Sequence, residues 1–259
     1  IRNLNLVNNY FEVKNLMLSK FNLEKLENLV LTNNQITYLD RESFSPNLKN
    51  LVRLILDENL IEILEARVFR HLAVLSFLSL NDNRISFIND LAFDGLYQLK
   101  TLLLSKNQIK SINQLTVNSL KKLNDLRLES NKLETIYLEL NSLKKIYLGN
   151  NSLQRIHFYK ESCNSGKLIL FELDVTMNLF NNTAYNGIQF DCPIFLEDFY
   201  LNRNNLIIIR DQLGENITLL LNKNIKSIKR LFFEYNNFSN LKLFSLDSNL
   251  DAIESLSLE

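Results

Sequence analysis

The stretch that decides the fold is residues 51–59, LVRLILDEN, with leucine at its first, fourth and sixth places and asparagine at its ninth. The pattern returns at residues 75–83 (LSFLSLNDN), 99–107 (LKTLLLSKN) and 123–131 (LNDLRLESN), each 24 residues after the one before. We call each such stretch a head and number its places one to nine. A fixed period of this length predicts a solenoid, in which every repeat forms one coil and packs against its neighbours.

Heads continue on both sides of these four with a looser period. They begin at Ile1, Leu26, Leu143, Leu170, Leu196, Ile228 and Leu241, and a degraded one lies at Leu219–Asn224. Val13–Leu18 also resembles a head but follows Ile1 by only 12 residues, and the last two full heads are only 13 apart. A coil needs about 20 residues or more, so we expect Val13–Leu18 to lie on the outer side of the first coil. The alternative is that residues are missing near 12–25 and 216–241.

The pattern predicts one domain, a single solenoid of about ten or eleven coils over residues 1–259. Both ends are expected to be apolar edges without a polar cap, so we expect the natural protein to continue. Leucine at places one, four and six should point inward, and the asparagine at place nine should bond backbone groups of the turn and the next coil. Phe44, Phe69 and Phe93 should stack ring on ring in the core.

The residues at places three, five, seven and eight should point outward from a short parallel strand and line the concave face. Place five reads Val30, Ile55, Ser79, Leu103, Arg127, Tyr147, Asp174, Tyr200, Leu220 and Phe232. This series is unusually apolar for exposed positions, and apolar surface with Tyr, Phe and Arg is typical of protein contacts. The candidate partner-binding residues are Ile55, Phe77, Leu103, Arg127, Tyr147, Tyr200 and Phe232. The alternative is that aromatic and β-branched residues simply suit exposed strands.

Acidic residues flank this series. They are Asp57, Glu58, Asp82, Asp125, Glu129, Glu172 and Asp174. They either steer a basic partner toward the face or form an ordinary solvated surface.

The two cysteines, Cys163 and Cys192, fall at nearly the same phase of adjacent coils, 20 and 22 residues after their heads. Neighbouring strands are about 5 Å apart, which suits the Cα separation of a disulfide, about 4.4–6.8 Å. We therefore predict a disulfide and an oxidising compartment; two free thiols in a cytosolic repeat protein are the alternative. Glycosylation motifs at Asn150, Asn181, Asn216 and Asn237 agree with a secreted chain, although an asparagine-rich sequence also makes such motifs by chance.

Chemistry beyond binding has little support in the sequence. Lysine plus arginine balance aspartate plus glutamate, 29 to 29, which argues against nucleic acid or an anionic membrane as partner. No apolar run long enough to cross a membrane is present. His71 and His157 lack neighbours at ligand spacing, and there is no phosphate loop or nucleophile elbow. We therefore expect no enzyme, no metal and no cofactor.

The four central coils resemble the typical extracellular leucine-rich repeat, L-x-x-L-x-L-x-x-N-x-L-x-x-L followed by Phe and a second L-x-x-L. The chain is similar to Toll-type receptor ectodomains and to the secreted leucine-rich-repeat immune proteins of insects. The short coil at Leu123, with a Cys in the long coil that follows and another before the next head, looks more like the insect proteins. The resemblance implies an α/β-type repeat solenoid, a horseshoe with a concave parallel β-sheet and a mostly irregular or short-helical convex side.

The resemblance also implies a function. It implies a secreted, non-enzymatic recognition module in innate immunity that binds a complement-like factor or pairs with a second leucine-rich-repeat chain. The sequence lacks the coiled coil and cysteine-rich cap of the insect group, so only the recognition arm is expected, and no binding motif transfers residue by residue. The alternatives are the ectodomain of a membrane-anchored receptor, an intracellular scaffold, and a self-associating structural protein or dimer.

Overall fold

The computed structural model describes residues 1–11, 21–140, 142–160, 168–180, 187–204, 225–236 and 253–257. The chain forms two compact units. Unit 1 consists of Ile1–Lys132 with Asn141–Leu143, and unit 2 consists of Leu133–Leu140 with Lys144–Glu259. The single solenoid over the whole chain stays a prediction.

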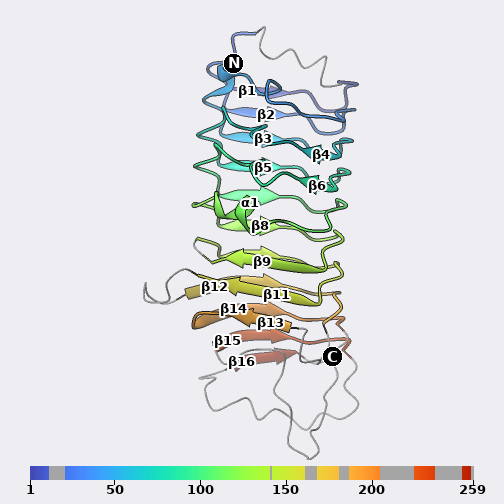
Figure 1. Cartoon of the computed structure of the whole chain (residues 1–259), viewed down its shortest axis with the longest axis vertical. Helices are drawn as coiled ribbons and strands as arrows, with labels where there is room; N and C mark the ends of the chain where they lie inside the picture. The colour runs from blue at the N-terminus through green and yellow to red at the C-terminus, as the bar shows by residue number, and fades with distance from the viewer. Residues whose placement is uncertain are drawn as a thin grey trace, which may run out of the picture. The chain divides into compact units, whose positions relative to one another are not determined.

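Unit 1 is built on a parallel sheet to which each described coil supplies one short strand. The strands are β1 (Asn3–Asn5), β2 (Asn28–Val30), β3 (Arg53–Ile55), β5 (Phe77–Ser79), β7 (Thr101–Leu103) and β8 (Asp125–Arg127). Each begins at place three of its head and ends at place five. Strands of consecutive coils pair in register, with Leu54 opposite Leu78, and they stack one upon the next in Figure 1. The predicted leucine-rich-repeat solenoid is confirmed in this unit.

The leucines of the heads form the core. Leu51, Leu54 and Leu56 are fully buried, as are the leucines at places one, four and six of the heads at Leu75 and Leu99. Successive side chains of a strand point to opposite faces. A buried place four therefore puts places three and five on the outer face of the sheet.

The asparagine at place nine forms the predicted amide ladder. Asn59 Nδ2 donates to the carbonyl of Leu56 in its own coil and of Leu31 in the preceding coil, at 3.0 and 2.9 Å. Its Oδ1 accepts the N–H of Ile36 at 3.1 Å. The equivalent asparagines, Asn83, Asn107 and Asn131, repeat this pattern. The ladder satisfies backbone groups that the turn leaves without partners inside the core.

The outer side of unit 1 is packed by aromatic rings and short local structure. Phe69 stacks on Phe44 and Phe93, with ring centroids 5.5 and 6.2 Å apart, which confirms the predicted stack. The next coil carries Val117 at the same place, on the short helix α1 (Gln114–Asn118). A 3₁₀ turn at Pro46–Leu48 and a two-stranded parallel pair, β4 (Ile63–Leu64) with β6 (Phe87–Ile88), complete this side in the described residues.

Unit 2 contains a parallel sheet in which every strand except β10 (Lys145–Tyr147) is longer than the sheet strands of unit 1. The strands are β10, β12 (Leu168–Asp174), β14 (Ile194–Tyr200), β15 (Ile225–Phe232) and β16 (Ile253–Ser257), and neighbours in this order pair with each other. In unit 1, β1 likewise pairs directly with β2. The closely spaced heads at Val13–Leu18, Leu219–Asn224 and Leu241–Asn249 lie outside the described residues.

Unit 2 also has a second parallel sheet that the sequence did not lead us to predict. Its strands are β9 (Thr135–Glu139), β11 (Arg155–Tyr159) and β13 (Gly187–Phe190), with β11 between the other two. Phe158 stacks on Phe190 at 4.8 Å between ring centroids. The predicted irregular or short-helical outer side therefore describes unit 1, whereas these coils of unit 2 have an extended outer side.

Cys192 follows β13 and is buried, and no free thiol is found among the described residues. Its expected partner, Cys163, lies outside the described residues, so the bond between the two stays a prediction.

Candidate protein-interaction face

The outward-pointing residues at places three and five form one face of the sheet in each unit, and we call it the sheet face of that unit. Each candidate partner-binding residue lies on it and is half-buried. Ile55, Phe77, Leu103 and Arg127 lie in unit 1, and Tyr147, Tyr200 and Phe232 lie in unit 2. Whether they bind a partner stays a prediction.

In unit 1 an arginine covers Phe77, the aromatic candidate residue of this unit's sheet face. Arg53 Cζ lies 3.8 Å above the ring centroid of Phe77, which faces Arg53 directly across the pair β3–β5. This is a cation–π contact. The guanidinium shields one side of the ring, so Phe77 presents a composite surface of ring and cation.

Arg127 is also held in place by a neighbour on its own strand. Its Nε and Nη2 lie 3.3 and 3.4 Å from the two carboxylate oxygens of Asp125. Both side chains stay partly exposed, so this ion pair orients the guanidinium more than it stabilises the fold.

Place five does not always point to solvent. Ser79 was expected on the outer face, yet it is 1% exposed. Its Oγ donates to Asp57 Oδ1 at 2.5 Å and lies 3.2 Å from Asn81 Nδ2. A small hydroxyl fits beneath these two side chains, and they cover it.

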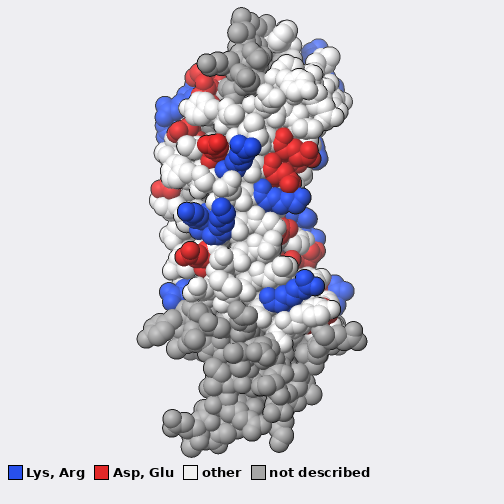
Figure 2. All heavy atoms as spheres, turned by 90° about the vertical axis from the view of Figure 1, so that its right-hand side faces the viewer, with Lys and Arg blue, Asp and Glu red and all other residues white. Residues whose placement is uncertain are grey.

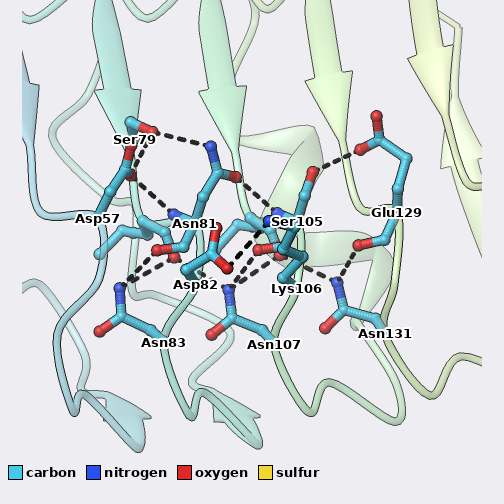
Figure 3. Close-up of polar contacts among 12 residues, drawn as sticks. Asp57, Ser79, Asn81, Asp82, Asn83, Ser105, Lys106, Asn107, Glu129 and Asn131 are labelled. Carbon is cyan, nitrogen blue, oxygen red and sulfur yellow. Dashed lines mark hydrogen bonds and ion pairs between the residues drawn. The ribbon is translucent and has the colours of Figure 1, made fainter.

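The residues at place seven form a second polar ladder in unit 1. Asp57 Oδ1 accepts the N–H of Asn81 at 2.9 Å, and Asn81 Oδ1 accepts the N–H of Ser105 at 2.8 Å. Ser105 Oγ then donates to Glu129 Oε2 at 2.5 Å. Figure 3 shows this ladder running beside the asparagines of place nine. Asp57 and Glu129 were expected either to steer a partner or to be solvated. Instead, Asp57 accepts hydrogen bonds from the following coil and Glu129 accepts one from the preceding coil.

Burial raises the pKa of the Asp57 carboxyl above its ordinary value of 3.8. Hydrogen bonds from Ser79 and Asn81 lower the pKa, while the charges of Asp82 and Glu58 raise it further. Desolvation is the largest of these effects, so Asp57 carries its charge at a cost to the fold.

In unit 2 the row at place three consists of ion pairs. Lys145 on β10 pairs with Glu172 on β12, and Arg230 on β15 makes a bidentate contact with Asp198 on β14. Glu172 also accepts the hydroxyl of Tyr147. Asp198 is only 7% exposed, and a buried carboxylate of this kind needs its partner.

The row at place five in unit 2 reads Tyr147, Asp174, Tyr200 and Phe232 across four neighbouring strands. Tyr200 and Phe232 stack with centroids 4.5 Å apart and planes within 8°. Desolvation, followed by the charges of Asp198 and Glu172, raises the pKa of Tyr200 above 10.0. The structure thus places Tyr147 and Tyr200 on the strands either side of Asp174, with Phe232 on the next strand beyond Tyr200.

Sequence reasoning did not single out Lys145, Asp198 and Arg230, and it predicted neither the contact of Arg53 with Phe77 nor the position of Asp174 between two tyrosines. Arg53, Asp198 and Arg230 stand at place three, and the signal was available in the register of the heads. Opposite charges at one place of adjacent heads, such as Asp198 and Arg230, predict an ion pair between neighbouring parallel strands.

Charges outside the sheet face are mixed in sign. Figure 2 shows lysine and arginine interspersed with aspartate and glutamate among uncharged residues on the flank that it displays. His157 on β11 pairs with Asp191 at 2.6 Å and packs edge-on against Tyr137 and Tyr159. Within the described ranges, no group of three or more His, Cys, Asp and Glu residues could hold a metal ion.

Of the four glycosylation motifs, only Asn150 lies in the described part of the chain. It is exposed and has a left-handed backbone, with φ of 54°. Asn181, Asn216 and Asn237 lie outside that part. Among the helices that the structure describes, none has the length and apolar character to cross a membrane.

Comparison with known proteins agrees with this architecture. Residues 24–85 and 75–133 match the family model described as leucine rich repeat. A search of curated protein sequences finds no match.

Similar solved structures include immune proteins of insects. The chain resembles the LRIM1/APL1C complex with a TM-score of 0.70 and 22% identity, over 93% of this chain and 40% of that one. The leucine-rich-repeat domain of APL1B is similar with a TM-score of 0.67 and 22% identity, over 95% of this chain and 67% of that domain. The Toll–Spatzle complex of Drosophila is similar with a TM-score of 0.56 and 20% identity, over 74% of this chain and 27% of that one. The chain thus spans less than half of the first of these structures, and the likeness is one of fold.

Proposed function

We propose that this leucine-rich-repeat chain, with the fold of insect immune proteins, is a non-enzymatic module that recognises a protein through its sheet face. The observation that carries the proposal is the row Tyr147, Asp174, Tyr200 and Phe232, half-buried and held in register on four paired strands. Tyrosine and phenylalanine provide large contact areas at low entropic cost. A rigid sheet presents them already ordered, which lowers the cost of binding.

The ion pairs of the face sharpen this proposal. Arg127 with Asp125 and Lys145 with Glu172 are already matched within the chain. The sheet face of each unit therefore offers apolar or aromatic surface beside ion pairs that compensate each other, and this composition is typical of protein interfaces. A broad electrostatic attraction to nucleic acid or to a membrane has no support in such an arrangement.

Innate immunity in the extracellular space is the setting we propose. The similar structures include a complex between two proteins, LRIM1 and APL1C, and a complex of Toll with Spatzle. By analogy, the partner of this chain is a protein, either a complement-like factor or a second leucine-rich-repeat chain. The glycosylation motifs and the expected bond between Cys163 and Cys192 support secretion.

Affinity capture from the extracellular fluid of the source organism tests the sheet face. The bait is the wild-type chain beside Phe77→Ala and Tyr147→Ala, with Phe87→Ala as a matched control. Phe87 is 54% exposed and lies on β6, outside the sheet face. We expect both sheet-face changes to weaken capture of the same protein without lowering thermal stability, and the control to leave it unchanged. If only Phe87→Ala abolishes capture, the partner binds outside the sheet face.

A membrane-anchored receptor ectodomain is the second candidate, favoured by the likeness to Toll. The full-length gene distinguishes the two, since a receptor requires a membrane anchor beyond this segment. Mass spectrometry of the unreduced protein addresses an intracellular scaffold. A peptide that links Cys163 to Cys192, together with a glycan on Asn181, would exclude it. Light scattering of the isolated chain tests self-association into a dimer or larger assembly.

A further inference from the structure

The sheet face of unit 2 contains one carboxylate that differs from its neighbours. Asp174 Oδ1 accepts the N–H of Thr176 at 2.9 Å. Its Oδ2 accepts no hydrogen bond, and no cation pairs with it, among the residues that the structure describes. Glu172 and Asp198 in the adjoining row are each matched, by Lys145 and Arg230. Asp174 thus presents an uncompensated charge at the surface of the face.

Aromatic rings flank this carboxylate on both sides. Tyr147 and Tyr200 are its register partners on β10 and β14. Neighbouring parallel strands lie about 4.8 Å apart, so Tyr147 and Tyr200 are the nearest place-five side chains on either side of a cation bound at Asp174, and aromatic rings attract cations. Phe232 extends the aromatic row on the far side of Tyr200, against which it stacks.

A glycine keeps the approach to Asp174 open. Place seven of the head at Leu143 is Gly149, where unit 1 carries larger side chains such as Asp57 and Asn81. A Cβ at Gly149 would lie 3.4 Å from Asp174 Oδ2 and 2.9 Å from Thr176 Oγ1. A side chain there would clash with Thr176 Oγ1 and lie in van der Waals contact with the free oxygen, whereas glycine covers this side of the carboxylate with no side chain.

The surroundings favour a cation over an anion. The charges of Asp198, Glu172 and Asp174 all act on the hydroxyl of Tyr200 in the direction that opposes its ionisation, while Arg230 acts against them. The balance at this row is therefore negative. An open carboxylate beside two aromatic residues binds a free small cation weakly but saturably, and it suits one side chain of a larger ligand.

We propose that Asp174 receives a lysine or arginine side chain of a protein partner that binds to the sheet face of unit 2, with Tyr147 and Tyr200 flanking the bound cation. The inference rests on the proposed function and names the chemistry of the partner at that face. The partner carries a cationic residue at the centre of its contact and apolar residues beside it, opposite Phe232.

The site is tested without the partner by titrating the full chain with Nα-acetylargininamide. The tyrosine rings are isotope-labelled and followed by NMR, and the neutral analogue Nα-acetylcitrullinamide serves as the ligand control. We expect saturable shifts of the Tyr147 and Tyr200 resonances with the arginine compound and none with the citrulline compound. Equal shifts with both compounds would overturn the inference, and this experiment uses the wild-type chain alone.

Two isosteric variants locate the charge. Asp174→Asn keeps the oxygen that accepts the N–H of Thr176, and we expect it to weaken argininamide binding about tenfold, as is usual for the loss of one charged contact. Asp125→Asn is the matched control, since Asp125 is half-buried on the sheet face of unit 1 and already paired with Arg127. Unchanged binding by Asp174→Asn, or the same loss with Asp125→Asn, would overturn the assignment.

The outcomes separate this inference from the proposed function. If argininamide does not bind while Tyr147→Ala still weakens capture of the partner, the cation site falls and the sheet face stands. If argininamide binds but no sheet-face change affects capture, the proposed function falls, and the protein partner named here falls with it.

Discussion

Ser79 Oγ donates to Asp57 Oδ1 at 2.5 Å, across two neighbouring coils. The same oxygen of Asp57 accepts the N–H of Asn81 at 2.9 Å. One carboxylate therefore joins the two coils through a side chain and a backbone group. The contact accounts for the burial of Ser79. Burial also removes water from Asp57, and this desolvation raises the pKa of the carboxyl although the hydrogen bonds from Ser79 and Asn81 lower it.

This contact predicts that Asp57→Asn stabilises the chain at neutral pH. A carboxyl whose pKa is higher in the folded than in the unfolded state binds more protons when folded. The stability that this carboxyl contributes is therefore complete below about pH 3.8, the unfolded pKa. It is lost as the pH rises through the higher pKa of the folded state. Asparagine keeps an acceptor for Asn81 and Ser79 and removes the desolvated charge. We expect a gain of about 0.5 kcal/mol at pH 7, after allowance for solvent screening.

Thermal unfolding followed by circular dichroism at about pH 7 and about pH 3 measures this effect. The advantage of the variant should disappear at the lower pH, where the wild-type carboxyl is protonated. Asp90→Asn is the control, since Asp90 is exposed and accepts a hydrogen bond from Asn113 at 3.1 Å. A variant less stable than wild type at neutral pH would show that the charge itself strengthens the ladder.

A second prediction concerns Asn83, a member of the ladder at place nine. Asn83→Ala removes the acceptor of the Ile61 N–H, at 3.1 Å, and the donor to the Leu56 carbonyl, at 3.0 Å. These bonds are buried, so their loss leaves unsatisfied polar groups in the core. We expect a loss of about 2–4 kcal/mol in the free energy of unfolding.

Denaturant unfolding measures this loss, and Asn124→Ala is the control. Asn124 is an exposed asparagine two residues before the buried Leu126, so its change should stay within about 0.5 kcal/mol. Equal effects of the two substitutions would mean that the ladder contributes no more than any surface asparagine.

The sequence was sufficient to predict the coil because the coil depends on residue type at fixed places. Leucine at places one, four and six is buried, and Asn59 bonds the groups expected of it. Each of these features repeats in neighbouring coils. A repeated pattern that agrees with one local geometry predicts that geometry well.

The interactions on the sheet face were harder to predict, because they depend on pairs of residues in different coils. Asp57 resembles a solvated acid until Ser79 and Asn81 are placed beside it. The second sheet of unit 2 was missed for a different reason. Its strands show the alternation of RIHFY at residues 155–159, a period of two that indicates a strand, but we expected the outer side of the coils to be mostly irregular or short-helical.

A third prediction compares two phenylalanines of unit 1. Phe69 is fully buried and stacks on Phe44 and Phe93. Phe69→Ala should therefore cost about 3–5 kcal/mol, the sum of lost burial and the cavity left behind. Phe87→Ala should cost about 0.5 kcal/mol or less, since this ring is 54% exposed. Denaturant unfolding of both variants decides the matter, and a small loss for Phe69→Ala would indicate that the outer side repacks around the gap.

The last prediction concerns the ionisation of Tyr200. Desolvation is the largest cause that raises its pKa above 10.0, and the charge of Asp198 is the second. The folded state therefore holds the phenol proton more tightly than the unfolded state, so Tyr200 contributes to stability below about pH 10 and the contribution is lost as the pH rises through the folded value. Asp198→Asn removes the second cause and frees the guanidinium of Arg230 from its partner, and both changes favour the phenolate.

We expect the pKa of Tyr200 to fall in this variant and to stay above 10.0 in Asp125→Asn, whose substitution lies in unit 1. A pH titration of the Tyr200 ring resonance by NMR measures both. An unchanged pKa in Asp198→Asn would mean that the charge of Asp198 does not act on this hydroxyl.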